Sequence, residues 1–380
     1  MTLRHAPTST GPGSESPAPS VRQLSFQWAG GPAIPVLSVL IALAFGAVFV
    51  LLTGNDPVKA YAALVQGAFG TPYDVTETIV SAIPLVLTGL SVAIAFRTGL
   101  FNIGAQGQLL VGALTAGWAG SQFGSLPGVV LMPIVIAFGI AGGAFYGGIV
   151  GVLKAVRGVN EVITTIMLNY TIVFVMHWLL QAGPMTAQNA LGTPASTPIG
   201  PGARLPVIIP NELVLFSRLH AGLLLAAAAV AVFWFLLWRT PLGYRLRAVG
   251  LGPRAAAQAG IDPARHIVLV MAIAGGFAGL GGMIEVSGLF GRVYDGFASS
   301  YGFDAIAVAL LGKNSPLGIV AAALLFGAFV HGGAYMQSHA NISSNLVAII
   351  QAFVLFVIAA EAIVRALIRR RGPRPVESIA

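Results

Sequence analysis

The stretch FNIGAQGQLL, residues 101–110, places three amides and two glycines in apolar surroundings. The amides are Asn102, Gln106 and Gln108. An amide inside hydrocarbon must bond a partner or face water, because an unpaired one is costly there. Any one of the three could simply bond a neighbouring helix. Together with Gly104 and Gly107, they predict a helix that is broken or packed around a polar pathway.

The composition of the 380-residue chain is typical of a membrane protein. Of its residues, 56% are hydrophobic and 8% are charged. In a soluble domain roughly 25% of the residues are charged. The mean hydropathy is +0.86. We therefore expect an all-α polytopic membrane protein.

The sequence lacks the residue patterns that are typical of common enzymatic and metal sites. It has no cysteine, and its six histidines show no metal-ligand spacing. The patterns HExxH and GxxxxGK(S/T) are also missing, the second being the loop that binds the phosphates of ATP. The sequence thus predicts no metal site, no catalytic residue and no bound cofactor in this chain.

Apolar segments recur along the chain, and eight of them are long enough to span a bilayer. They lie at about 33–54, 77–96, 128–153, 162–182, 219–238, 266–290, 317–337 and 344–366. Two weaker segments lie at about 100–119 and 301–312, and the second is too short to cross comfortably. Counting both gives about ten transmembrane segments, one or two of them short or broken.

The distribution of basic residues favours this count. With ten crossings and a cytoplasmic N-terminus, 16 of the 20 Lys and Arg residues fall on the inner side. Cytoplasmic loops carry such an excess, so we expect both termini to be cytoplasmic. The net charge of +8 is then a topology signal, and we expect no nucleic-acid partner.

The chain divides into a membrane domain and two tails. Residues 1–30 are rich in Pro, Ser, Thr and Gly and predict a disordered cytoplasmic tail. Residues 31–368 form the expected transmembrane domain, and 369–380 a basic cytoplasmic tail. The Pro- and Gly-rich outer loop at 183–218 could be a lid, a docking surface or a plain connector.

The longest inner loop, 239–265, predicts a short helix that docks on a partner. Pro253 suits a first helical position, Ala255 to Ala259 favour helix, and Gly260 ends it. A helix of two turns is unstable alone in water. It lacks the large apolar face of a helix that lies on lipid. A protein partner on the cytoplasmic side is therefore the favoured interpretation.

Several single residues can be interpreted in two ways. Asp304 lies in the weak segment 301–312, where an ionisable group suggests function, although it could pair near the interface. Asn169 and Tyr170 are candidates for a cavity wall. His177 and His331 are expected to bond neighbouring helices. The spacing Gly275-xxx-Gly279 predicts close helix packing.

Four blocks of the sequence resemble a known family. They are 101–110, 158–170, 247–261 and 302–312, and they resemble permease subunits of ABC importers of the ribose and branched-chain amino acid class. The branch for nucleosides and simple sugars is the most similar. The resemblance implies inward transport of nucleosides or simple sugars by alternating access. Branched-chain amino acids are the alternative substrates within the class, and a secondary transporter is a less favoured alternative.

The resemblance also implies partners and a location. It implies a separate ATPase of two fused domains that holds ATP and Mg, a second permease in a heterodimer, and an extracytoplasmic substrate-binding protein. This permease, in contact with the lipid bilayer of a bacterial plasma (inner) membrane, would not itself be an enzyme. The expected pathway residues are Asn102, Gln106, Gln108, Asn169, Tyr170 and Asp304. The expected residues for coupling to the ATPase are Arg247, Pro253, Ala255, Ala256, Ala259 and Gly260.

Overall fold

The computed structural model describes residues 33–187, 192–210, 212–297 and 300–370, with the backbone alone for 33–35, 37 and 358–370. The predicted tail at 1–30, and residues 371–380 of the predicted basic tail, lie outside this part of the chain. The described residues are mainly helical, and β-pairing within them is limited to isolated bridges. The prediction of an all-α protein is confirmed.

All the regular elements of the described residues are helices or helical turns. They are α2 (Ala33–Leu52), α3 (Pro57–Phe69), α4 (Pro72–Arg97), α5 (Ala105–Gln122), α6 (Gly128–Arg157), α7 (Glu161–Gln181), the 3-10 turn η1 (Pro201–Ala203), α8 (Gly222–Arg239), α9 (Pro241–Leu251), α10 (Pro253–Gln258), α11 (Pro263–Glu285), the π-helix η2 (Val286–Phe290), α12 (Tyr301–Leu311), α13 (Pro316–Ala340) and α14 (Asn345–Arg370).

A helix stands at each of the ten expected segments. Among the described residues, six helices are long and apolar enough to cross a membrane: α4, α6, α7, α8, α11 extended by η2, and α13. Three shorter apolar helices lie at Ser38–Leu52, Tyr301–Leu311 and Asn345–Val357. Length and composition thus support six crossings directly, and the count of ten remains a prediction.

Helix α3 was not expected from the sequence. Its buried residues Ala60, Leu64, Gly67 and Ala68 recur at helical spacing, so one face packs inward. A Cβ on Gly67 would lie 2.2 Å from the Cβ of Tyr335 in α13, so this face sits directly on α13. Its apolar run is short and contains Lys59 and Gln66, which made it look like an outer loop.

Glycines set the packing at the centre of the bundle. A Cβ on Gly275 of α11 would lie 2.1 Å from the carbonyl oxygen of Gly143 in α6, and one on Gly279 would lie 2.3 Å from that of Gly139. The predicted Gly275-xxx-Gly279 packing is confirmed, and its partner is a matching Gly139-xxx-Gly143 pair. Such small residues let two backbones approach closely.

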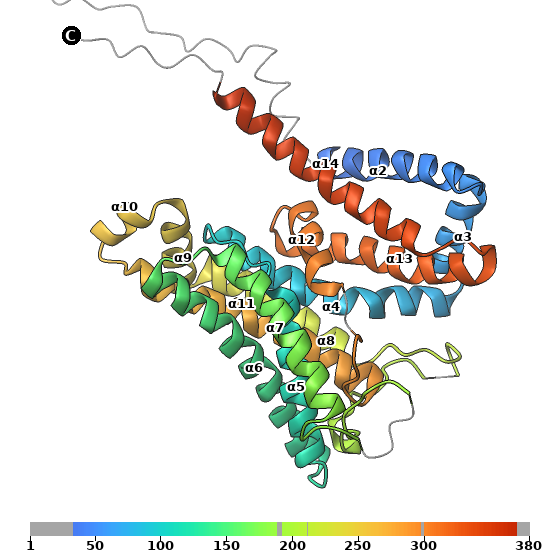
Figure 1. Cartoon of the computed structure of the whole chain (residues 1–380), viewed down its shortest axis with the longest axis horizontal. Helices are drawn as coiled ribbons and strands as arrows, with labels where there is room; N and C mark the ends of the chain where they lie inside the picture. The colour runs from blue at the N-terminus through green and yellow to red at the C-terminus, as the bar shows by residue number, and fades with distance from the viewer. Residues whose placement is uncertain (1–32, 188–191, 211, 298–299, 371–380) are drawn as a thin grey trace, which may run out of the picture.

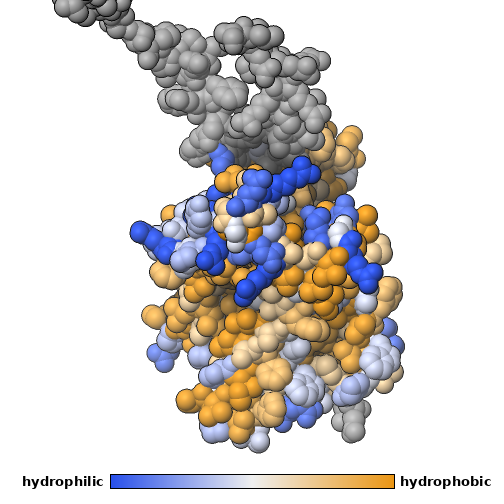
Figure 2. Space-filling view, turned by 90° about the vertical axis from the view of Figure 1, so that its left-hand side faces the viewer, coloured by the Kyte–Doolittle hydropathy of each residue, from blue (hydrophilic) through white to orange (hydrophobic). Residues whose placement is uncertain are grey.

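The helices gather their basic residues at one end of the bundle. At this end, which we call the basic end, α4, α6 and α8 finish, α11 begins, and α9 and α10 project (Figure 1). Figure 2 views this side and shows hydrophilic residues gathered in a band above a largely hydrophobic surface. The opposite end, called the loop end, carries the connections at 183–221 and 291–297.

Candidate functional site

The helical structure is interrupted between α4 and α5, at residues 98–104, as the sequence at 101–110 predicted. Gly99 has φ +73°, a conformation that favours glycine. Three side chains form hydrogen bonds with one another at this break. Asn102 Nδ2 donates to Gln108 Oε1 (2.9 Å) and Gln108 Nε2 donates back to Asn102 Oδ1 (3.0 Å). Ser91 of α4 joins them through its Oγ, 3.1 Å from Asn102 Nδ2.

Gln106 joins the beginnings of two helices. Its Oε1 accepts a hydrogen bond from the backbone N–H of Gly302, at 2.8 Å. A Cβ on Gly302 would lie 2.2 Å from the backbone nitrogen of Gln106. The N-termini of α5 and the short helix α12 therefore meet inside the bundle. In transporters, such discontinuous helices frequently surround the substrate site.

Asn169 binds the same region from α7. Its Oδ1 accepts from the backbone N–H of Gly107 and its Nδ2 donates to the carbonyl of Ile103, both at 2.9 Å. Tyr170 is 62% exposed and points away from Asn169 around the helix. Asp304 is half-buried in the first turn of α12, where a carboxylate suits the positive end of the helix.

The structure therefore brings four of the six predicted pathway residues to one place. Asn102, Gln106, Gln108 and Asn169 are all buried around the start of α5, and each takes part in hydrogen bonds within the bundle. Tyr170 lies apart from them. In this conformation, these hydrogen bonds join the buried amides to other parts of the bundle, so the amides act as groups that hold the helices together. Their role in lining a pathway stays a prediction.

The predicted short helix of the inner loop is present as α10. Gly260 follows it with φ +78°, which ends the helix as expected. Ala255 and Ala259 are exposed, whereas Ala256 is only 4% exposed and packs within the chain. Of these three alanines, only Ala255 and Ala259 present a surface that a partner can reach. Pro253 begins the helix and is exposed as well.

Helix α9 was missed by the sequence analysis, which treated residues 239–250 as loop. Thr240 caps it, since its side chain accepts from the N–H of Gly243 at 3.1 Å. Leu251 ends the helix and is 92% exposed beside α10. Arg247 is half-buried, and its Nε donates to the carbonyl of Gly243 at 3.4 Å. Together with the exposed residues of α10, Leu251 forms a larger surface that a partner could contact.

The end of α9 touches the break between α4 and α5. A Cβ on Gly250 would lie 2.7 Å from the backbone of Thr98, and one on Gly99 would lie 3.2 Å from the carbonyl oxygen of Gly250. Nearby, Arg97 donates to the carbonyl of Asn314 at 3.1 Å and stacks over Trp238 at 5.2 Å. The loop that carries α10 is thus in direct contact with the segment that carries Asn102.

Charged groups also cluster near the loop end, where the sequence analysis had not singled them out. Glu77 is 1% exposed and is clasped by Arg218, whose Nε lies 3.1 and 3.0 Å from the two carboxylate oxygens. The hydrogen bonds that Arg218 donates to the Glu77 carboxylate raise the pKa of Arg218. Arg218 and Tyr73 help to line an open pocket of about 890 Å³.

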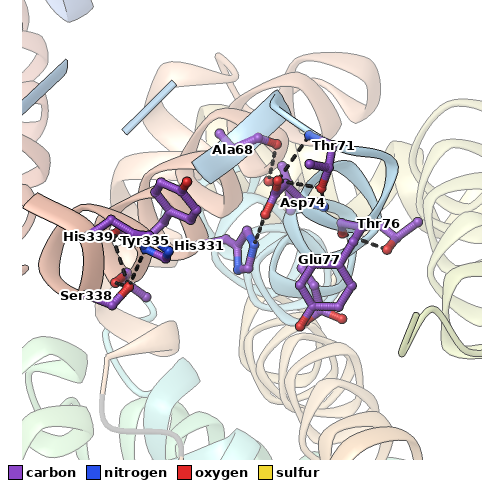
Figure 3. A network of polar contacts seen from close by, with 12 residues as sticks. Ala68, Thr71, Asp74, Thr76, Glu77, His331, Tyr335, Ser338 and His339 are labelled. Carbon is purple, nitrogen blue, oxygen red and sulfur yellow. Dashed lines mark hydrogen bonds and ion pairs between the residues drawn. The ribbon is translucent and has the colours of Figure 1, made fainter. Parts of the chain in front are cut away.

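Asp74 ties α4 to α13. It accepts hydrogen bonds from the backbone and hydroxyl of Thr71, and its Oδ1 lies 3.3 Å from Nε2 of His331 (Figure 3). His177, which was expected to bond a neighbouring helix, lies instead 2.6 Å from Asp295 in the loop-end connection at 291–297. Bonding of His331 to a neighbouring helix is confirmed. Among the described residues, no three His, Asp or Glu side chains form a group that could hold a metal ion.

Comparison with known proteins identifies the family. Residues 75–359 match the family model described as the permease component of a branched-chain amino acid transport system. The chain belongs to this permease family. The match covers the bundle from the start of α4 into α14, so this permease is a multi-pass membrane protein. No solved structure matches it significantly.

Named relatives cover most of the permease. A glucose ABC transporter permease protein of Haloferax volcanii is 40% identical over 86% of this chain and 87% of its own length. A guanosine ABC transporter permease protein of Bacillus subtilis is 37% identical over 87% of this chain and 94% of its own length. A second guanosine permease protein of that strain is 29% identical over 67% of this chain and 80% of its own.

Proposed function

We propose that this permease carries nucleosides or simple sugars inward as one subunit of an ABC importer, driven by a separate ATPase. One observation carries the mechanism. The exposed side of α10 and Leu251 is continuous, through Gly250, with the break at 98–104. Motion of an ATPase bound at α10 would therefore reach the start of α5 through direct backbone contact.

The amides would then act at the point where that motion arrives. Asn102, Gln108 and Gln106 hold the start of α5 against α4 and α12. Displacing the break would exchange bonds within the bundle for bonds to a substrate. Amide and hydroxyl groups recognise sugar hydroxyls and nucleobase edges without pairing charges. Asn169 would follow the same rearrangement, because it binds the backbone on both sides of Gly104.

The names of the relatives support this substrate class. Two relatives at 40% and 37% identity are described as glucose and guanosine permeases. The family description favours a second candidate, branched-chain amino acids. Such a zwitterion needs partners for both a carboxylate and an ammonium group, whereas the buried cluster at α5 is made of neutral amides.

The remaining partners follow from the same membership. The pair of guanosine permeases in one strain supports a second permease and a heterodimer. A fused, two-domain ATPase would hold ATP and Mg at the basic end, which we place in the cytoplasm with both termini. An extracytoplasmic binding protein would deliver substrate at the loop end. The location would be the plasma membrane of a bacterium.

Reconstitution tests the proposal. Alone in liposomes, the permease should neither hydrolyse ATP nor accumulate labelled guanosine or glucose. Together with the ATPase, second permease and binding protein encoded beside it, it should accumulate one of them when ATP is supplied. Accumulation by the single chain would overturn the proposal. Accumulation of leucine in place of both would establish the second candidate.

A further inference from the structure

An apolar groove of about 460 Å³ runs between α8 on one side and α6 and α11 on the other. All of its lining residues are apolar, and small ones such as Ala144, Ala228 and Gly276 keep it open. Phe277, which lines the groove, makes a T-shaped contact with the buried Phe233 of α8, with ring centroids 6.1 Å apart. All three helices are long and apolar enough to span a membrane, so the groove lies at bilayer depth.

Two of these helices carry an arginine on the groove-lining side at the basic end. On α11, Arg265 precedes Ala272 by seven residues and Gly276 by eleven, which is close to two and three helical turns. On α8, Arg239 follows Val232 by seven residues. A rise of 1.5 Å per residue places each arginine about 10 Å beyond the groove, so the two lie at a similar depth.

The distance along α11 from Arg265 to the far end of the groove matches the length of one lipid. From Arg265 to Leu280, at the far end of the groove, α11 rises by about 22 Å. Half of a bilayer, headgroups included, is about 20–22 Å thick. An acyl chain in the groove would therefore bring its phosphate to the level of the two arginines.

The two guanidinium groups are available to an anion. Both arginines are exposed, and within the described residues neither forms an ion pair with a carboxylate. Asp262 lies close to Arg265, but its carboxylate caps the backbone N–H groups of Ala264 and Arg265. Arg239 stacks on Trp234 at 5.0 Å, and tryptophan is enriched at the headgroup level of membranes.

We infer that the groove between α6, α8 and α11 binds an anionic phospholipid of the leaflet at the basic end. The acyl chain fills the apolar groove and Arg265 binds the phosphate. Arg239 binds it as well once its guanidinium leaves Trp234, which lies on the side of α8 away from the groove. This site is separate from the α5 region and from α10. It gives the permease a specific requirement for anionic lipid.

Native mass spectrometry of the purified full chain tests the site, with phosphatidylglycerol and phosphatidylcholine as probes. The wild type should retain phosphatidylglycerol in preference to phosphatidylcholine. A basic residue close to an anionic headgroup contributes about fivefold to its binding, and this attraction falls off within a Debye length, so the pair R239Q/R265Q beside the bound lipid should weaken retention about 30-fold. The groove-filling pair A228L/A272L should reduce retention with both arginines intact.

A matched charge control separates this site from general attraction. Arg245 and Arg254 are exposed at the same end but lie on α9 and α10, away from the groove. R245Q/R254Q should leave phosphatidylglycerol retention close to that of the wild type. Equal loss in this control, or unchanged retention in R239Q/R265Q, would overturn the inference. Thermal unfolding in detergent verifies that each variant is folded.

The same groove could instead receive a helix of a second permease, and one cysteine decides between them. The native chain contains no cysteine, so a photocrosslinker attached to the thiol of A228C reports only on the groove. Crosslinking of this probe to phosphatidylglycerol supports the lipid site. Crosslinking to the second permease in the assembled transporter would overturn it.

Discussion

Gly250 at the end of α9 lies directly against Thr98, where α4 gives way to α5. A Cβ at Gly250 would come within 2.7 Å of the Thr98 Cα. Two backbones therefore meet without a side chain between them. This contact joins α9, which leads into α10, to the break at 98–104 that carries Asn102.

Adding a side chain at this contact should disturb transport. Gly250→Val would force the two backbones apart, and overpacking of this kind costs about 1–3 kcal/mol. We expect uptake by the reconstituted transporter to fall while the ATPase still co-purifies. Gly252→Ala is the matched control, because a Cβ there meets Ala255 at an ordinary 3.7 Å. Equal uptake in both variants would exclude the contact as a transmitter.

A bulky residue on the exposed side of α10 should prevent docking of the ATPase. Ala255→Trp and Ala259→Trp alter exposed positions, so the bundle should fold normally while co-purification of the ATPase and uptake of every substrate are lost. Ala264→Trp, at an exposed position on α11, is the control and should retain both. A transporter with Ala255→Trp that keeps its ATPase would refute α10 as the docking helix. Ala256 is unsuitable for this test because it is buried.

Replacing Asn102 and Gln108 distinguishes a packing role of these amides from a role in transport. Asn102→Leu removes the acceptor of Gln108 Nε2 in a buried site and should lower the stability by about 1–3 kcal/mol. Replacing both amides with Leu should recover part of this loss, because of the three side chains only the Ser91 hydroxyl then lacks its partners. If the amides line the pathway, uptake and the preference between guanosine and glucose stay altered in the double variant. Wild-type uptake in that variant would assign them to packing alone.

Labelling of single cysteines tests the orientation of the bundle. Gln258→Cys on α10 should be inaccessible to an impermeant reagent added outside intact cells, if the basic end faces the cytoplasm as proposed. Leu213→Cys in the exposed loop-end connection should react with it. Permeabilised cells supply the control, in which both should react. The reverse pattern in intact cells would invert the topology.

His220 should make the loop end sensitive to acid. Burial lowers the pKa of His220 to about 4; nearby Glu77 opposes this shift, and Arg218 acts in the same direction as burial. The backbone N–H of Gly222 donates to its Nδ1 at 3.1 Å, which requires a neutral ring. In the unfolded chain the ring takes up a proton near pH 6.5. Stability should therefore fall as the pH drops from 6.5 towards 4, by up to about 3 kcal/mol.

Thermal unfolding in detergent across this pH range measures the effect. His220→Asn keeps an acceptor for Gly222 but cannot be protonated, so its melting temperature should decline less over the same interval. Parallel curves for the wild type and the variant would show that His220 does not control the acid response.

The sequence by itself determined the class of the protein and the positions of its main helices. Runs of apolar residues long enough to span a bilayer leave few alternatives to helix, because lipid offers no partners for backbone groups. The short helix at Pro253 was predictable because proline and glycine mark helix ends locally. The break before α5 was predictable because glycines and amides interrupt an otherwise apolar segment.

The tertiary structure alone decided what the polar residues contact. Asn102 and Gln108 pair with each other, and Gln106 reaches Gly302, 196 residues away. Tyr170 follows Asn169 in the sequence but points elsewhere, because successive helical residues differ in direction by 100°. The hydrogen bonds of Arg218 to Glu77 and the contact of Gly250 with Thr98 depend on distant partners. Such partners are fixed by packing, so no local pattern in the sequence could reveal them.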